Sequence, residues 1–272
     1  MTETFKDKVV IITGASSGIG KALALEFGGR GARVVMAARS AERLENAAGE
    51  VKAKGAEVLT VVTDVSKEED CRRLIDRTVA EYGGIDVLIN NAGISMRALF
   101  EKTELKVIRQ LMEVNFWGTV YCTSHALPYL LERKGSLAGI SSIAGYKGLP
   151  GRTGYSASKF AMHGFLETLR IENMKKGLHV LIACPGFTAS NIRNTALNGK
   201  GEVQGESPRD EGKMMPATEV ARRIAGAILK RKHRLTLTAQ GKLTVLLNKF
   251  FPKLVDKLVY KHMAKEPDSP FN

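Results

Sequence analysis

Short apolar segments rich in β-branched residues alternate with segments of helical spacing through the first 185 residues. Most of the short segments are continuously apolar, which is typical of strands covered on both faces. Repeated β-α-β units of this kind predict an α/β fold with a Rossmann-like, doubly wound parallel sheet and right-handed crossovers. The predicted strands are Val9–Thr13, Arg33–Ala38, Val58–Thr63, Val87–Asn90, Leu137–Ser141 and Val180–Cys184. The predicted helices lie near 18–30, 41–54, 67–82, 103–132, 153–176 and 217–230.

Length and composition fit a single domain with a C-terminal helical extension. A chain of 272 residues, 44% of them hydrophobic, can bury one large core. We therefore assign residues 1–240 to the α/β domain and residues 241–272 to a basic, amphipathic helical extension. A polar, glycine-punctuated segment at about 186–216 interrupts the periodicity. It follows the carboxyl end of a strand, where ligands bind in this architecture, and we expect it to be a substrate loop.

The extension combines positive charge with an apolar stripe. Ten Lys or Arg residues and one acid, Asp256, lie between Lys230 and Lys265, in a chain of formal net charge +13. Pro252 should divide the helical segment, because proline lacks a backbone donor and crowds the preceding turn. The stripe either lies on an anionic membrane or packs over the substrate site or a partner subunit. Its members recur at three- and four-residue spacing: Leu243, Leu246, Leu247, Phe250, Phe251, Leu254, Val255, Leu258 and Val259.

Other classes of protein are disfavoured by the composition. No nucleic-acid-binding motif accompanies the positive charge. The N-terminus is polar and leads directly into a strand, and no run approaches the roughly 18 apolar residues of a spanning helix. Cys71, Cys122 and Cys184 are far apart and show no metal-ligand spacing. We expect a cytoplasmic protein, at most peripheral at a membrane, with reduced and buried thiols, no metal and no nucleic-acid partner.

A glycine-rich turn, T-G-A-S-S-G-I-G, joins the first predicted strand to the first helix at 13–20. Gly14 permits a tight turn, Gly18 lets the backbone approach a phosphate, and Gly20 lets the helix pack close to the sheet. The helix N-terminus then presents N–H groups to a pyrophosphate. The run also matches the G-x-S-x-G elbow of serine hydrolases, but no histidine lies in a convincing catalytic loop. The predicted dinucleotide contacts here are Gly14, Ser16, Ser17, Gly18, Ile19 and Gly20.

The end of the second predicted strand favours NADP over NAD. An NAD enzyme would place an acid there to bind the ribose hydroxyls, whereas this chain has Ala38 followed by Arg39. The Arg39 guanidinium can bind a 2′-phosphate through two hydrogen bonds, although it could also be an ordinary surface arginine. Asp64 and Val65 close the third strand, where an acid could meet the adenine amino group or begin the next helix.

Tyr155 and Lys159 are four residues apart, so they share one face of a predicted helix. A tyrosine with its ordinary pKa near 10 is a poor acid–base catalyst at neutral pH. A nearby ammonium favours the phenolate and should lower the Tyr155 pKa toward the working range. Tyr155 would then protonate a carbonyl oxygen as a hydride reaches the carbonyl carbon.

Six motifs in one order make the chain resemble a short-chain dehydrogenase/reductase, closest in pattern to hydroxysteroid dehydrogenase-like and lipid-ketone reductases. They are T-G-x-x-x-G-x-G at 13–20, N-N-A-G at 90–93, Asn115, Ser142, Tyr155-x-x-x-Lys159 and Pro185-Gly186. The resemblance makes residues 1–240 a dinucleotide-binding and catalytic domain. It implies that Ser142 holds the carbonyl oxygen, that Lys159 binds the nicotinamide ribose, and that Asn115 anchors a water leading to Lys159. The catalytic residues it implies are Asn115, Ser142, Tyr155 and Lys159. The further cofactor contacts it implies are Asn91, Ala92, Gly93, Tyr155, Lys159, Pro185, Gly186 and Thr188.

The segments expected around these residues favour a hydrophobic ketone as substrate, because Arg97 and Arg152 are isolated in the sequence and no arginine cluster suits a polyanion. The sequence therefore predicts an NADP-dependent reductase that interconverts a lipid- or steroid-like ketone and a secondary alcohol. The alternative is a nucleotide-binding interaction protein or pseudoenzyme without turnover. The apolar wall residues expected are Ile94, Met96, Leu99, Phe100, Leu149, Phe187, Met214 and Met215.

The two long helical segments, 103–132 and 153–176, carry more apolar residues than one face against a sheet requires. In the family that the chain resembles, these helices pair across a two-fold axis, so we expect a homodimer. A tetramer is disfavoured because the usual closing strand is missing: Arg234–Thr238 is followed by more than thirty further residues.

Overall fold

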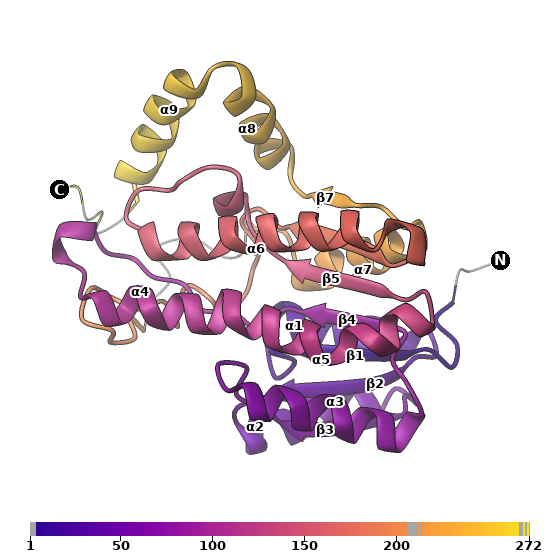
Figure 1. Cartoon of the computed structure of the whole chain (residues 1–272). Helices are drawn as coiled ribbons and strands as arrows, with labels where there is room; N and C mark the ends of the chain where they lie inside the picture. The colour runs from indigo at the N-terminus through magenta and orange to yellow at the C-terminus, as the bar shows by residue number, and fades with distance from the viewer. Residues whose placement is uncertain (1–3, 206–211, 213, 267–268, 270, 272) are drawn as a thin grey trace.

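In the computed structural model, which describes residues 4–205, 212, 214–266, 269 and 271, seven parallel strands form one sheet (Figure 1). The strand order is β3-β2-β1-β4-β5-β6-β7, so the chain winds outward from β1 in both directions. This confirms the predicted Rossmann-like, doubly wound sheet. The strands are β1 Val9–Thr13, β2 Arg33–Ala38, β3 Val58–Val62, β4 Val87–Asn90, β5 Ser136–Ile140, β6 His179–Cys184 and β7 Arg234–Thr236.

Helices cover both faces of the sheet, which is why most strands are continuously apolar. On one face α1, α2 and α7 pack through a buried cluster that contains Phe27, Leu44 and Ile224. On the other face α3, α5 and α6 pack through a second cluster. The main helices are α1 Gly18–Gly29, α2 Ala41–Lys52, α3 Glu68–Tyr82, α4 Leu105–Met112, α5 Gly118–Glu132, α6 Thr153–Glu172, α7 Ala217–Leu229, α8 Ala239–Phe250 and α9 Pro252–Ala264.

The expectation of one continuous helix over 103–132 is wrong. A 3-10 turn, η1 (Phe100–Lys102), precedes α4, and a π-helical segment, η2 (Glu113–Trp117), separates α4 from α5. Asn115 lies within this π segment, completely buried. A π-helical turn changes the direction of a side chain relative to a regular helix and often marks a functional position. Further 3-10 turns among the described residues include η3 (Ile143–Gly145) and η4 (Met174–Lys176).

The closing strand that we expected to be missing is present, so its absence no longer disfavours a tetramer. Residues Arg234–Thr236 form β7, which pairs in parallel with β6. The strand has only three residues, and the buried Leu237 lies just after it. Such a short segment does not produce a clear strand pattern in the sequence.

The C-terminal extension is a pair of helices, α8 and α9, which stand out from the body in Figure 1 (yellow). Pro252 occupies the first turn of α9 and divides the two helices, as predicted. Polar contacts that join α8 and α9 to the body include a hydrogen bond from Asn248 Nδ2 to the Tyr146 carbonyl and the ion pair between Lys147 and Asp256. Across the residues described, no helix is both long and apolar enough to cross a bilayer.

Candidate active site

The glycine-rich turn has the geometry of a dinucleotide-binding turn. Gly14 and Gly18 have φ of +65° and +53°, which only glycine adopts readily. A Cβ on Gly20 would lie 2.2 Å from the Gly14 carbonyl oxygen, so no larger residue fits there. Ser17, the N-cap of α1, makes no side-chain capping bond with the described residues, which leaves the first N–H groups of α1 available to an anion.

The end of β4 is tied to this turn by side-chain hydrogen bonds. The Thr13 hydroxyl accepts from the backbone N–H groups of Asn91 and Ala92, each at 3.0 Å. The Asn91 amide donates in turn to the carbonyl oxygens of Thr13 (2.9 Å) and Gly14 (3.3 Å). Asn91 therefore positions the two ends that would face a dinucleotide. Gly93 continues this wall: a Cβ there would lie 3.1 Å from Asn115 Oδ1 and 3.6 Å from Lys159 Nζ.

At the carboxyl end of β5, Ser141 and Ser142 point in different directions. The Ser141 hydroxyl bonds His163 Nε2 at 2.7 Å in the buried interior. The Ser142 hydroxyl accepts from the Ala144 N–H (3.2 Å) and also hydrogen-bonds the Tyr155 phenol. Alternation along a strand explains this split. Of the two serines, Ser142 is the one brought to Tyr155.

Tyr155 and Lys159 lie on one face of α6 and are both buried. Lys159 Nζ donates to the Ile140 carbonyl at 2.9 Å and lies 5.8 Å from the centre of the Tyr155 ring. Burial lowers the pKa of Lys159 to about 8, because the ammonium is poorly solvated. The Tyr155 pKa is raised, chiefly by burial, against the opposing effects of the Ser142 hydrogen bond and the Arg152 charge.

The expectation that Lys159 lowers the Tyr155 pKa is therefore wrong for this state of the protein. Burial of the phenol dominates, and the Lys159 ammonium is engaged with the Ile140 carbonyl. The consequence for chemistry is definite. A tyrosine with a raised pKa is protonated at neutral pH, which is the form that donates a proton to a carbonyl oxygen.

Asn115 connects three parts of the site. Its Oδ1 accepts from the Ile94 N–H (2.8 Å), and its Nδ2 donates to the Ile94 carbonyl (3.0 Å) and to Ser158 Oγ (2.9 Å). Ser158 then donates to the Tyr155 carbonyl at 2.8 Å. The π-helical segment is thus fastened both to the wall after β4 and to the catalytic helix. The sequence reasoning missed Ser158, although its place three residues after Tyr155 puts it on the same helix.

The other predicted cofactor residues lie near the carboxyl ends of the strands. Arg39 follows β2, is exposed, and has no side-chain partner among the described residues. Asp64 accepts from the Ser66 N–H and hydroxyl, so it shapes the turn before α3, while Val65 is buried. Beyond β6, Pro185 is buried, Gly186 packs against Thr238, and the buried Thr188 donates to the Gly186 carbonyl at 3.3 Å.

The walls expected around the substrate differ from the sequence prediction in four residues. Met96 is completely buried, in a small cluster with Tyr155 and Leu197, whereas Phe100 is 59% exposed. Arg97 and Arg152 are not isolated: both approach the same carboxylate oxygen of Glu266, at 3.6 and 3.4 Å. Residues 206–211 and 213 of the predicted substrate loop lie outside the described residues. The described part is joined to the body by the pairings Met96↔Leu197 and Thr188↔Met215.

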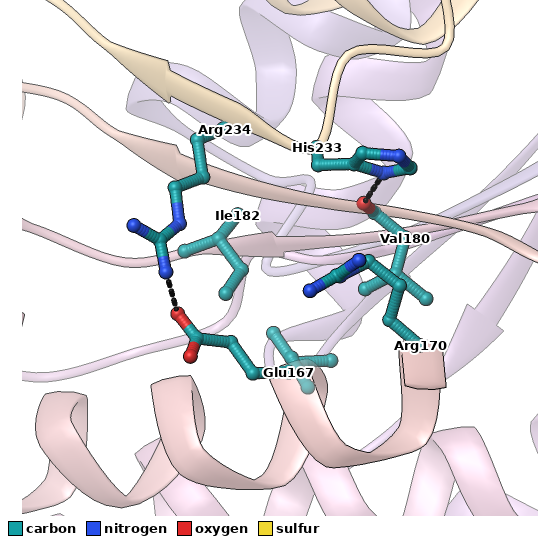
Figure 2. A pocket seen from close by; sticks show the side chains of 7 residues that line it. Glu167, Arg170, Val180, Ile182, His233 and Arg234 are labelled. Atoms are coloured by element: carbon teal, nitrogen blue, oxygen red, sulfur yellow. Dashed lines mark hydrogen bonds and ion pairs between the residues drawn. The ribbon is translucent and has the colours of Figure 1, made fainter. Parts of the chain in front are cut away.

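A hollow of about 280 Å³ lies elsewhere, between α6 and strands β6 and β7 (Figure 2). It is lined by Leu166, Glu167, Arg170, Val180, Ile182, His233 and Arg234. None of the predicted site residues lines it. Figure 2 shows the ion pair between Glu167 and Arg234, two of the lining residues, and we assign this hollow no part in the chemistry.

Comparison with known proteins decides the family. The family model described as "short chain dehydrogenase" matches residues 8–200. The chain belongs to the short-chain dehydrogenase family. It is therefore an oxidoreductase that acts on small molecules with a nicotinamide dinucleotide. The match spans the glycine-rich turn, Asn115, Ser142 and the Tyr155–Lys159 pair.

Among the family's members, this short-chain dehydrogenase is similar to plant proteins named for a steroid activity. It is 36% identical to 11-beta-hydroxysteroid dehydrogenase 1A of Arabidopsis thaliana, over 94% of this chain and 75% of that one. It is 38% identical to 11-beta-hydroxysteroid dehydrogenase A of Arachis hypogaea, over 99% of this chain and 80% of that one.

Two solved structures show the same fold at 26% identity. The alcohol dehydrogenase of Thermococcus sibiricus, complexed with 5-hydroxy-NADP, gives a TM-score of 0.76 and covers 85% of this chain and 96% of its own. A short-chain dehydrogenase/reductase of Burkholderia phymatum, in complex with NAD, gives 0.82 and covers 93% and 96%. Because these two proteins carry different dinucleotides, the choice between NADP and NAD rests on this chain's own residues.

Proposed function

We propose that this short-chain dehydrogenase is an NADP(H)-dependent reductase that interconverts a hydrophobic, lipid- or steroid-like ketone and the corresponding secondary alcohol. The observation that carries the proposal is the meeting of Ser142, Tyr155 and Lys159 beside the glycine-rich turn of 13–20. The glycines at 14, 18 and 20 form the tight turn that a dinucleotide-binding site requires. At Gly20 any side chain would collide with the turn itself, so the turn could not close as tightly.

The residues divide the chemistry of carbonyl reduction among them. When bound, NADPH would supply the hydride to the carbonyl carbon. Ser142 donates a hydrogen bond to the carbonyl oxygen as negative charge develops there, and Tyr155 transfers its phenolic proton to that oxygen. Lys159 would hold the nicotinamide ribose, while the Ser142 hydrogen bond and the Arg152 charge favour the phenolate that Tyr155 becomes. Asn115 holds the Ile94 backbone and Ser158 in register with Tyr155.

The preference for NADP rests on Arg39. Its exposed guanidinium follows the carboxyl end of β2, beside the buried Ala38, where a carboxylate would instead bind the ribose hydroxyls of NAD. A guanidinium pairs well with a phosphate. The preference for a hydrophobic ketone rests on the apolar residues near Tyr155, which include the partly buried Ile94, Leu149 and Ile192.

Turnover tests the proposal directly. Purified protein is given NADPH or NADH with a panel of ketones and aldehydes (steroids, 3-oxo lipids, retinal and small carbonyls), and cofactor oxidation is followed by absorbance. We expect faster turnover with NADPH and with the hydrophobic ketones. Tyr155→Phe should lower kcat by orders of magnitude and leave NADPH affinity nearly unchanged, since only the proton donor is lost. Absence of turnover with every substrate would favour the alternative, a nucleotide-binding protein without activity.

The active form is proposed to be a homodimer that pairs through α5 and α6. Apolar side chains that the sheet does not need remain exposed there: Trp117, just before α5, is 41% exposed and Phe160, on α6, is 46% exposed. Light scattering at micromolar concentration should give the dimer mass. A monomer would show that these side chains are not an interface.

We further propose that this protein, otherwise cytoplasmic, docks peripherally on anionic membranes through the outer face of α8 and α9. Of the apolar stripe expected from the sequence, Val255 is buried, as is Met263 further along α9, whereas most of the other members face outward. Exposed fractions of about half or more are found at Leu243, Leu246, Phe250, Phe251, Leu254 and Leu258.

Charge favours a lipid surface over a second copy as the occupant of this face. The exposed lysines 242, 249, 253, 257 and 261 border the stripe, and the one acid in α8 and α9, Asp256, is paired with Lys147. Two copies of such a face would bring like charges together, whereas anionic headgroups would complement them. Peripheral docking of this kind would also allow a hydrophobic ketone to pass from the lipid to the active site.

Sedimentation with vesicles tests the docking. The full chain should sediment with vesicles rich in phosphatidylserine at low salt and remain in solution with phosphatidylcholine alone. The double variant Phe250→Ser/Phe251→Ser should lose binding, whereas Leu105→Ser, which changes a 63% exposed leucine at the start of α4, should keep it. If the parent stays in the supernatant with both vesicles and self-associates instead, the face is an interface between copies and the membrane proposal fails.

A further inference from the structure

One acidic side chain of the C-terminal segment is buried between two arginines of the substrate walls. Glu266 lies two residues beyond α9, and its side chain is only 3% exposed. Its Oε2 is 3.6 Å from Arg97 Nε and 3.4 Å from Arg152 Nη2. The arginine side chains are themselves only 11% and 13% exposed. Charges this well buried depend strongly on one another, because removing one leaves the others poorly solvated.

The two arginines belong to different wall segments. Arg97 follows β4, where its N–H donates to the Leu197 carbonyl and where Ala98 pairs with Arg152. Arg152 precedes α6, and its carbonyl accepts from the Ser156 N–H at 2.8 Å in the first turn of the catalytic helix. The Glu266 carboxylate therefore joins the segment after β4 to the start of the helix that carries Tyr155.

The end of α9 holds this carboxylate in place. Met263 is buried, and its carbonyl accepts from the Glu266 N–H (3.2 Å) and from the Ser269 hydroxyl (3.3 Å). The neighbouring His262 ring lies 5.9 Å from the ring of Phe187, which begins the substrate loop. The contacts place the last turn of α9 over the segments that surround Tyr155.

The carboxylate also bears on the charge around the Tyr155 phenol. Among the described residues, the groups that face the phenol are the Ser142 hydroxyl, the Cys184 thiol and the cations of Arg152, Arg193 and Lys159. Arg152 favours the phenolate and so opposes the raised pKa that burial gives Tyr155. A carboxylate close to the Arg152 guanidinium weakens that effect, since the opposite charges cancel at the phenol.

We propose that Glu266 is a positioning residue of this active site: it fixes Arg97 and Arg152 across the substrate walls and offsets the positive charge that Arg152 presents to Tyr155. The C-terminal segment then contributes directly to the geometry and charge of the active site. This rests on the proposed function in one respect, which is the role of Tyr155 as the proton donor.

The pH dependence of ketone reduction tests the role. Reduction needs the protonated phenol, so kcat should fall as the pH rises through the Tyr155 pKa. In Glu266→Gln the charge of the Arg152 guanidinium is offset less, the Tyr155 pKa falls, and the midpoint should move to lower pH by about 0.5–1 unit. A residue that only stabilised the fold would change the amplitude or the melting temperature and leave this midpoint in place.

Matched variants distinguish the proposed effect of Glu266 on Tyr155 from the effect of a general change in net charge. Asp256→Asn removes one negative charge from the same extension at an exposed pair, and should leave the midpoint unchanged. Glu266→Asp keeps the charge and should shift the midpoint less than Glu266→Gln. If Glu266→Gln fails to fold, Arg97→Met/Glu266→Met replaces a buried ion pair by apolar side chains, a change that folds usually tolerate, and should give the same shift. An unshifted midpoint, or an equal shift in Asp256→Asn, would overturn the proposal.

A titration without substrate keeps the result independent of turnover. The phenolate absorbance of the parent minus that of Tyr155→Phe reports this one tyrosine, and the same difference in the Glu266→Gln background should titrate at lower pH. If the parent reduces no ketone, the proposed function fails while the titration still decides the part played by Glu266. Equal titration midpoints in the two backgrounds would show that Glu266 does not act on Tyr155.

Discussion

Replacing Asn115 with alanine should cost both stability and activity, because its side chain makes three hydrogen bonds inside the π-helical segment. The Ile94 N–H and carbonyl would lose their side-chain partners, and each such buried group costs about 1–3 kcal/mol. The Ser158 hydroxyl would lose the hydrogen bond from Asn115 but would still donate to the Tyr155 carbonyl, so its loss should cost less free energy. We expect the free energy of unfolding to fall by about 3 kcal/mol. For a chain of this size that is a drop of about 5 °C in Tm.

The loss of activity should exceed what the loss of stability explains. Asn115 sets the place of the Gly93–Ile94 wall against Lys159, and a displacement of about 1 Å in a catalytic group can cost about a hundredfold in rate. Calorimetry and steady-state kinetics well below Tm separate the two effects. Asn173→Ala is the matched control. It removes one buried hydrogen bond, from the Asn173 side-chain amide to the Leu169 carbonyl, at the C-terminal end of α6. It should lower Tm by about 2 °C and leave kcat/KM unchanged.

Two results would refute the reasoning on Asn115. A Tm within about 1 °C of the parent would show that the three hydrogen bonds contribute little. Equal kinetic losses in Asn115→Ala and Asn173→Ala would show that the amide acts on the fold in general and not on the site.

Two further predictions concern the cofactor and the response to pH. Arg39→Asp should weaken NADPH binding much more than NADH binding, because it places a like charge where the 2′-phosphate would bind; dissociation constants of both cofactors for both proteins measure this, and an equal loss would contradict the assignment. His163 and His179 are buried, and burial lowers the pKa of each to about 4, so the unfolded chain takes up protons first as the pH falls. Stability that is present above about pH 6.5 should therefore be lost between about pH 6.5 and pH 4, by up to about 1.4 kcal/mol per pH unit for each histidine. Urea unfolding at pH 7 and pH 5 measures the loss, and equal midpoints would show that these rings accept protons in the folded state.

The sequence by itself determined six of the seven strands of the sheet and the locally encoded parts of the candidate site. Continuous apolar runs identify strands buried on both faces, because a helix covers each face of the sheet. The spacing of Gly14, Gly18 and Gly20 identifies the tight turn, and the i, i+4 spacing of Tyr155 and Lys159 places them on one helix face. These are local patterns: each depends on residues within one or two turns of chain. The family match over 8–200 covers the same region.

Tertiary structure decided what depends on contacts between distant segments. The π segment at Asn115 exists with side-chain bonds to Ile94 and Ser158, and no local pattern predicts it. The raised Tyr155 pKa depends on how much of the domain surrounds the phenol, which outweighs the nearby lysine that the sequence makes visible. Arg97, Arg152 and Glu266 are separated by up to 169 residues in the sequence and meet only when the extension folds back over the walls. Such long-range contacts set the charge and solvation of the site, because electrostatic interactions and burial depend on distances in space and not on separation along the chain.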